Sequence, residues 1–237
     1  MTLRPIGILG GMGPEATILL QRKLVEAVPV SDDGDHIPLL IDMNPQVPSR
    51  IDHLIEGKGE DPGPTLAAMA RRLQGAGAAA LAMPCNTAHH YADAITDAVT
   101  VPLLNIVKLA ADHAVSELGA GGCVGVLASP AVRRTRLFET AMQARGLSIV
   151  WPTDSDRLLT AIRRIKVDGP SDDARETLRT ASIALAKAGA DLQLVACSEF
   201  SLIADGVADE VKSADTIDLL VHAIIEFSQI GYLSDAD

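Results

Sequence analysis

The chain has 237 residues, 48% of them hydrophobic and only 3% aromatic, so it can bury one or two cores packed mainly from Ala, Leu, Ile and Val. Its formal net charge of −11 argues against a nucleic-acid or anionic-membrane partner, because nothing would offset the repulsion from phosphate groups. Three cysteines, no recognisable secretory leader and no apolar run near the ~18 residues of a membrane span predict a cytoplasmic protein.

The first half of the chain alternates short apolar strands with amphipathic helices. The hydrophobic spacing predicts strands at 5–9, 37–43, 79–83 and 101–106, and helices at 15–27, 65–74, 87–99 and 107–118. Two prolines favour an extended loop at 44–50, on the ligand side of an open parallel sheet. Residues 57–64 are rich in glycine and proline, and we expect them to form a mobile loop and a lid.

The second half repeats this alternation. Strands are expected at 123–127, 148–150 and 192–196, and helices at 133–145, 156–165 and 172–187. A last helix at 216–227 follows the completed second half, so we expect it to fold back onto the first domain. Alternating strands and helices predict an α/β fold with a doubly wound parallel sheet in each half.

Two stretches of the chain look like copies of one unit. Thr65-Leu66 and Thr177-Leu178 each begin 20 residues before a cysteine, and an Ala-Gly-Ala triplet lies nine to seven residues before each cysteine. A period of roughly a hundred residues is too long for a solenoid, so we predict two similar domains, 1–106 plus 213–237 and 107–212. The alternative is chance similarity between unrelated segments.

Cys85 and Cys197 end these two units, each where a strand passes into polar residues. Backbone N–H groups that follow a strand point into the same space as the sulfur, where they lower a thiol pKa and bind a carboxylate. Both effects serve the removal of a proton from the carbon next to a carboxylate. A single buried cysteine is usually inert, but two matched cysteines that are each followed by polar residues favour a catalytic role.

Three other features carry less weight. The glycines around Met12 resemble a phosphate cradle but lack the third glycine of a dinucleotide fingerprint, so we expect this segment to approach a small anionic substrate. His89 and His90 are adjacent, whereas a metal site on a helix needs a spacing of four, so capping and packing roles are expected. The residue after Cys123 is apolar, so Cys123 is expected in the core.

Four segments in order resemble the aspartate/glutamate racemase family of cofactor-independent amino-acid racemases. The resemblance spans nearly the whole chain and is carried by residues 6–14, 44–50, 83–89 and 195–199, which read IGILGGMGP, NPQVPSR, MPCNTAH and VACSE. It implies two α/β domains related by a pseudo-two-fold axis, a site in the cleft between them, no cofactor, no metal and a homodimer.

The resemblance also implies roles for the residues around the two cysteines. Cys85 and Cys197 match the family's two bases, which act from opposite faces of the substrate. Asn86 and Thr87 would hold the α-carboxylate, helped by Ser129 after the first strand of the second half.

Charged residues would recognise the rest of the substrate. Arg50 matches an arginine in the family's proline loop and would bind the side-chain carboxylate as a charge-assisted pair. Lys166 falls near a lysine that closes over the same carboxylate, although the segment 163–170 is shorter here. Ser198 and Glu199 occupy positions where the family usually has Thr-Glu, and both would line the substrate site. Glutamate rather than histidine at position 199 favours the aspartate-type branch over the dedicated glutamate racemases.

These residues predict a racemase of a small acidic amino acid, aspartate first and glutamate second, that moves a proton between two cysteines without pyridoxal phosphate. Within the same superfamily, the alternatives are a broad-specificity racemase or a maleate isomerase-like dicarboxylate enzyme. From another class, the alternative is a non-catalytic protein that binds a small dicarboxylate, and the retention of both cysteines argues against it.

Overall fold

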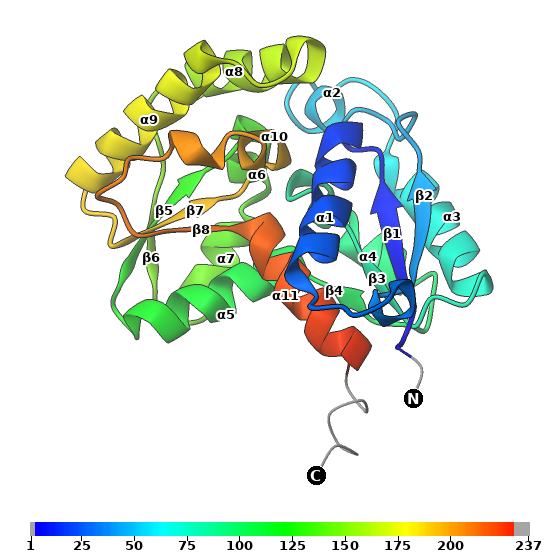
Figure 1. Cartoon of the computed structure of the whole chain (residues 1–237). Helices are drawn as coiled ribbons and strands as arrows, with labels where there is room; N and C mark the ends of the chain where they lie inside the picture. The colour runs from blue at the N-terminus through cyan, green and yellow to red at the C-terminus, as the bar shows by residue number, and fades with distance from the viewer. Residues whose placement is uncertain (1–2, 230–237) are drawn as a thin grey trace.

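A computed structural model describes residues 3–229, which form two four-stranded parallel sheets flanked by helices (Figure 1). The first sheet has the order β2-β1-β3-β4 and the second has the order β6-β5-β7-β8. The strands are β1 (Ile6–Gly10), β2 (Leu39–Met43), β3 (Ala80–Ala82), β4 (Leu103–Leu104), β5 (Cys123–Leu127), β6 (Ser148–Val150), β7 (Leu192–Val195) and β8 (Ser213–Asp215). The matching orders confirm the α/β class and the two similar domains.

Helices connect the strands throughout the described part of the chain. They are α1 (Pro14–Ala27), α2 (Arg50–Leu54), α3 (Pro62–Gly75), α4 (Ala92–Thr96), α5 (Ile106–Leu118), α6 (Pro130–Thr135), α7 (Leu137–Gln143), α8 (Ser155–Asp168), α9 (Asp172–Lys187), α10 (Ser198–Ser201) and α11 (Thr216–Gln229), with 3₁₀ turns η1 (Asp33–Asp35), η2 (Thr87–Tyr91) and η3 (Ala204–Gly206). Within residues 3–229, no helix is both long and apolar enough to cross a membrane.

The strand register shows that the two cysteines occupy equivalent positions. In the first sheet, Ala82 of β3 pairs with Leu104 of β4. In the second sheet, Leu194 of β7 pairs with Ala214 of β8. Ala82 and Leu194 also pair with Ile8 and Val126, each of which directly follows the glycine of its own central strand, and each cysteine lies three residues after Ala82 or Leu194. Both cysteines therefore lie just beyond the carboxyl end of a central strand, where open α/β sheets bind ligands.

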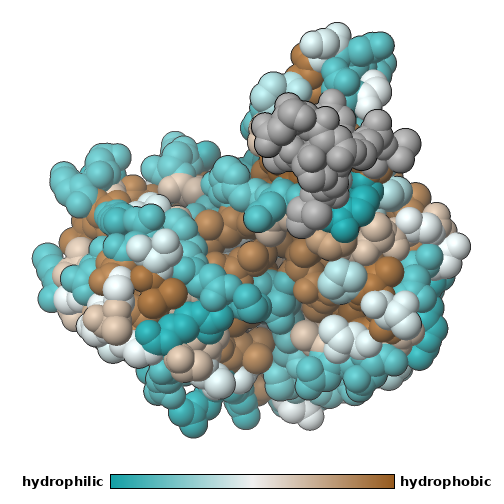
Figure 2. Space-filling model, turned by 90° about the horizontal axis from the view of Figure 1, so that it is seen from below, coloured by the Kyte–Doolittle hydropathy of each residue, from teal (hydrophilic) through white to brown (hydrophobic). Residues whose placement is uncertain are grey.

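One hydrophobic cluster spans both sheets. It joins apolar residues of α1 and β1 to those of β5 and β7 through the buried faces of α5 and α11. Helix α11 contacts α1 and α5 and lies between the two halves, so the last helix does return to the first domain (Figure 1). Figure 2 shows the face seen from below, where apolar residues gather near the middle and hydrophilic residues surround them.

Several predicted boundaries were wrong. The helix expected at 133–145 is two helices, because Arg136 between them takes the left-handed conformation with φ 56°. The helix expected at 87–99 is a 3₁₀ turn followed by the short α4. Residues 62–64 belong to α3 instead of the glycine-rich loop, because Pro62 fits a first helical turn and Asp61 accepts a hydrogen bond from the Gly63 N–H at 2.8 Å.

The return to the first domain starts later than predicted. Residues 213–215 form β8, which pairs with β7 and therefore belongs to the second sheet. The helix that packs against the first domain begins at Thr216, and residues 230–237 of the predicted segment lie outside the described residues.

The shared core predicts that the two domains unfold together. Leu220 on α11 is fully buried in this core, so Leu220→Ala should lower the free energy of unfolding by about 2–5 kcal/mol in one transition. Val167, whose exposed fraction is 83%, supplies the control, and Val167→Ala should change the free energy of unfolding by less than about 0.5 kcal/mol. Denaturant unfolding checks both values. Two separate transitions, with only one affected by Leu220→Ala, would contradict a shared core.

Candidate active site

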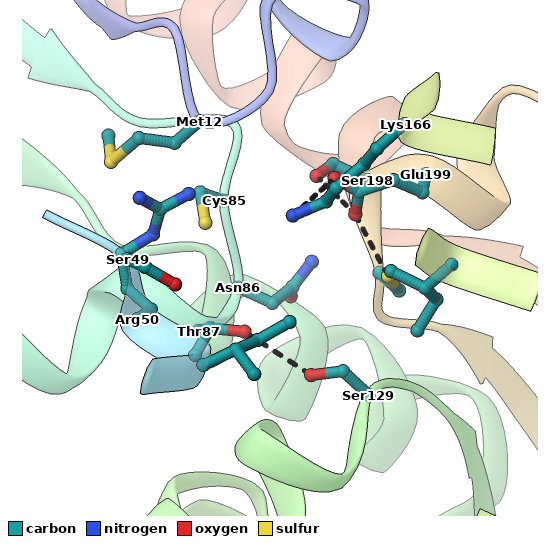
Figure 3. Close-up of a pocket in the computed structure, with 13 residues that line it drawn as sticks. Met12, Ser49, Arg50, Cys85, Asn86, Thr87, Ser129, Lys166, Ser198 and Glu199 are labelled. Carbon is teal, nitrogen blue, oxygen red and sulfur yellow. Dashed lines mark hydrogen bonds and ion pairs between the residues drawn. The ribbon is translucent and has the colours of Figure 1, made fainter. Parts of the chain in front are cut away.

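One cavity collects all ten residues predicted for the site. It lies at the carboxyl ends of the strands, between the two domains, where open α/β sheets bind ligands, and its lining residues come from both domains. Its lining residues are Met12, Ser49, Arg50, Ile51, Cys85, Asn86, Thr87, Ser129, Ile162, Lys166, Cys197, Ser198 and Glu199 (Figure 3).

The glycine-rich turn after β1 brings Met12 into this cavity. Gly11 has φ +92°, and a Cβ there would lie 2.4 Å from the carbonyl carbon of Asn44, so only glycine fits. The Gly11 N–H donates to the Thr17 hydroxyl at 3.0 Å, which fixes the turn against α1. Met12 is 3% exposed and closes one wall of the cavity.

Arg50 is held beside Cys85 by its own loop. Its Nη1 donates to the carbonyls of Val47 at 3.2 Å and Pro48 at 3.0 Å. Figure 3 shows the guanidinium group on the same side of the cavity as the Cys85 side chain. Among the described residues Arg50 has no carboxylate partner, so its positive charge is available to an anion in the cavity.

Cys197 is buried and held as a thiol. Its Sγ donates a hydrogen bond to Oε2 of Glu199 at 3.2 Å. Burial, and then the negative charge of Glu199, raise the pKa of the Cys197 thiol well above its usual range. The backbone N–H groups of Glu199 and Phe200 act in the opposite direction but are outweighed. The N–H groups therefore act in the expected direction, but the expected net lowering of the thiol pKa is wrong for this cysteine.

Lys166 reaches the cavity from the last turn of α8. Its Nζ lies 3.3 Å from Oε1 of Glu199, and Figure 3 shows its amine pointing into the space opposite Arg50. The Glu199 side chain is only 10% exposed, so Lys166 offsets a charge that has been removed from water. In this arrangement Glu199 bonds to protein groups on both of its oxygens.

Polar side chains from both domains form the rest of the wall. Nδ2 of Asn86 donates to the Thr216 hydroxyl at 3.0 Å, and that hydroxyl donates to the Val195 carbonyl at 3.0 Å. This arrangement directs the amide nitrogen of Asn86 towards Thr216 and leaves one N–H for another acceptor. The hydroxyls of Thr87 and Ser129 lie 3.5 Å apart across the domain junction.

The sequence did not reveal Ser49, Ile51 and Ile162. Ser49 caps α2, where its hydroxyl accepts from the Asp52 N–H at 3.2 Å. Ile162 lies four residues before Lys166, so helical spacing would have placed both on one face of α8. Ile51 follows Arg50 directly in the first turn of α2, a helix that the sequence analysis did not predict.

The other predicted features have different surroundings. His89 is buried with both ring nitrogens bonded to backbone groups, whereas His90 is exposed. Within residues 3–229, no group of three His, Cys, Asp or Glu side chains is arranged to hold a metal ion. Cys123 is only partly buried at the start of β5, because this first position lies at the edge of the core.

Comparisons with known proteins agree with this geometry. The sequence model of a family described as Asp/Glu/Hydantoin racemase matches residues 9–224. The broad specificity amino-acid racemase RacX of Bacillus subtilis (strain 168) is 24% identical over 230 residues, which cover 93% of this chain and 96% of that protein.

Solved structures show the same fold. Picrophilus torridus aspartate racemase matches with a TM-score of 0.83 at 26% identity, covering 95% of this chain and 94% of that one. An aspartate racemase homologue from Pyrococcus horikoshii OT3 matches with a TM-score of 0.74 at 21% identity, covering 96% of this chain and 100% of that one. Because the family match spans most of its length, the chain belongs to the Asp/Glu/Hydantoin racemase family.

Proposed function

We propose that this protein, an isomerase of the racemase class, interconverts the enantiomers of an acidic amino acid, aspartate above all, by proton transfer between two cysteines. The observation that carries the proposal is that Cys85 and Cys197, from equivalent positions in the two sheets, line one cavity. Two groups on opposite sides of a carbon can remove its proton from one face and return a proton to the other.

The protonation state of Cys197 suggests how a cycle begins. Because Cys197 is held as a thiol, it is ready to give a proton, and Cys85 as thiolate would take the α-proton of the bound substrate. The electron pair left on the α-carbon then accepts the Cys197 proton from the other face. After this step Cys85 is the thiol and Cys197 the thiolate, which is the form that converts the opposite enantiomer.

The charges around the cavity favour a substrate with two carboxylates. Arg50, which has no carboxylate partner among the described residues, is placed to bind the distal carboxylate, and Lys166 can join it by leaving Glu199. The free N–H of Asn86 and the hydroxyls of Thr87 and Ser129 supply donors for the α-carboxylate. Donors already in place for a carboxylate also stabilise the charge that develops when the α-proton leaves.

A second candidate is a broad-specificity racemase. A wider opening of about 1250 Å³, which includes open solvent, adjoins the cavity and shares Arg50, Lys166 and Glu199 with it. A longer side chain than that of aspartate has room to extend into this opening between α1 and the loop 44–50. The similarity to a relative named as a broad specificity amino-acid racemase supports the same possibility.

The two-cysteine proposal predicts that each thiol is essential. Cys85→Ala and Cys197→Ala should each lower kcat for aspartate racemisation by at least about a hundredfold, since each removes one proton-transfer group. Cys123→Ser, which alters a cysteine outside the cavity, should retain most activity. Polarimetry or chiral chromatography measures all three rates. Near-normal racemisation by either of the first two variants would rule out the two-thiol mechanism.

The recognition proposal predicts a substrate-dependent loss at Arg50. Arg50→Ala should lower kcat/KM for aspartate by about ten- to a hundredfold, because a charge-assisted bond to the distal carboxylate is lost. Turnover of alanine, which has no distal charge, should change much less. Arg71→Ala, which removes an exposed arginine that lies outside the cavity, is the control. Equal losses on both substrates would mean that Arg50 has a structural role.

The contact between Glu199 and Cys197 predicts a change in thiol reactivity. Glu199→Gln removes the nearby negative charge, so the pKa of Cys197 should fall, although burial keeps it above its usual range. Alkylation of Cys197 at pH 8, followed by mass spectrometry, should become about threefold faster for each unit by which the pKa falls, because a larger thiolate fraction is partly offset by a weaker nucleophile. Glu15→Gln, at the exposed rim of the wider opening, should leave this rate unchanged. An unchanged or slower rate in Glu199→Gln would contradict the assignment.

A further inference from the structure

The residue four positions after each cysteine contacts the carbonyl group of that cysteine. Nδ1 of His89 lies 2.9 Å from the Cys85 carbonyl oxygen. The hydroxyl of Ser201 lies 3.4 Å from the Cys197 carbonyl oxygen. These contacts involve the backbone behind each sulfur, and neither His89 nor Ser201 lines the cavity.

His89 continues to the first turn of α5. The N–H of Ile106 donates to Nε2 of His89 at 3.2 Å, so Nε2 carries no proton. The proton of the neutral ring is therefore on Nδ1, which donates to the Cys85 carbonyl. Burial lowers the pKa of His89 to about 4, so the ring is uncharged at neutral pH. One ring thus joins the end of β3 to the start of α5 with two hydrogen bonds.

Ser201 reaches the corresponding helix through Asp215. The Ser201 hydroxyl lies 2.7 Å from Oδ1 of Asp215, and the same oxygen accepts from the Ile217 N–H at 2.8 Å. Because the hydroxyl has one hydrogen and the shorter bond to Asp215 uses it, the 3.4 Å approach to the Cys197 carbonyl is a contact without a hydrogen bond of its own. The connection from Cys197 to α11 therefore resembles the one from Cys85 to α5, because each runs from the carbonyl of a cysteine to the start of a helix. Its contact with the cysteine carbonyl is longer, at 3.4 Å compared with 2.9 Å.

The two connections end at equivalent places. Asp215 directly follows the residue that pairs with Leu194, and Asn105 directly follows the residue that pairs with Ala82. Oδ1 of Asn105 accepts from the Val107 N–H at 3.0 Å, just as Asp215 accepts from Ile217. Helices α5 and α11 contact each other and belong to the core that spans both sheets.

We infer that His89 and the Ser201–Asp215 pair are positioning residues, each of which sets the backbone of one cysteine relative to the helices that join the two domains. The link to racemisation rests on the proposed function. The positioning itself is a statement about each thiol, and it can be measured without turnover. A role in general stability alone would affect both cysteines together, whereas this inference assigns each connection to one cysteine.

The test at His89 uses two variants that each preserve one of its bonds. The amide nitrogen of His89→Asn can replace Nδ1 and keep the bond to Cys85, whereas the amide oxygen of His89→Gln can replace Nε2 and keep only the bond to Ile106. His89→Gln should lower kcat by about a hundredfold with little change in KM and should alter the alkylation rate of Cys85 at least threefold. His89→Asn should stay within about tenfold of the parent kcat and keep the parent alkylation rate. His90→Asn is the exposed control.

The test at the second connection uses Ser201→Ala and Asp215→Asn. Ser201→Ala should alter the alkylation rate of Cys197 and leave that of Cys85 unchanged, with a smaller effect than His89→Gln has on Cys85. Asp215→Asn keeps an oxygen for Ser201 and Ile217, so its rates should stay closer to the parent.

Cysteine-specific mass spectrometry gives the alkylation rates, and thermal unfolding of each variant identifies any that fail to fold. The inference would be overturned if the alkylation rates of both cysteines changed together in every variant. It would also be overturned if His89→Asn and His89→Gln had equal alkylation rates and equal kcat. If the parent protein racemises no acidic amino acid, the proposed function fails, while the alkylation rates still decide the positioning. If alkylation is cysteine-specific but kcat does not follow it, the link to racemisation is overturned.

Discussion

The proposed proton transfer imposes one geometric constraint on the structure, namely that two groups must reach the same carbon from opposite faces. A single sheet presents its catalytic edge from one side, so a second sheet is needed to supply the opposing group. The chain meets this need by using the same strand order twice and by placing a cysteine at the same position beyond each central strand. The shared core through α5 and α11 then holds the two edges in a fixed relation.

The charges in the cavity are arranged so that few of them are buried without a partner. Glu199 contacts both Lys166 and Cys197, so the carboxylate is neutralised by one neighbour and keeps the other protonated. A substrate carboxylate that draws Lys166 away would leave the buried Glu199 carboxylate without its cationic partner, so a lysine shared between the two carboxylates is the less costly arrangement. Arg50, held by backbone carbonyls of its own loop, is oriented before any ligand arrives.

Sequence reasoning succeeded where the signal was local or repeated. The paired cysteine segments and the central strands could be predicted because their residue types and spacing recur along the chain, whereas most of the other predicted cavity residues came from the resemblance to the racemase family. Strand β8 was missed because Ser213, Ala214 and Asp215 have little strand propensity and are ordered by pairing with β7. The thiol state of Cys197 depends on burial and on the orientation of Glu199, and neither quantity is encoded in residue spacing.

Deuterium transfer from solvent measures the two-faced proton transfer most directly. L-aspartate is incubated with the protein in D₂O without added cofactor, and the two enantiomers are separated at low conversion and analysed for deuterium on the α-carbon. The account predicts that newly formed D-aspartate carries deuterium while the remaining L-aspartate keeps its α-proton, because removal and return occur on opposite faces. Deuterium appearing equally in both enantiomers at the earliest times, or no exchange of the α-proton with any acidic amino acid, would contradict it.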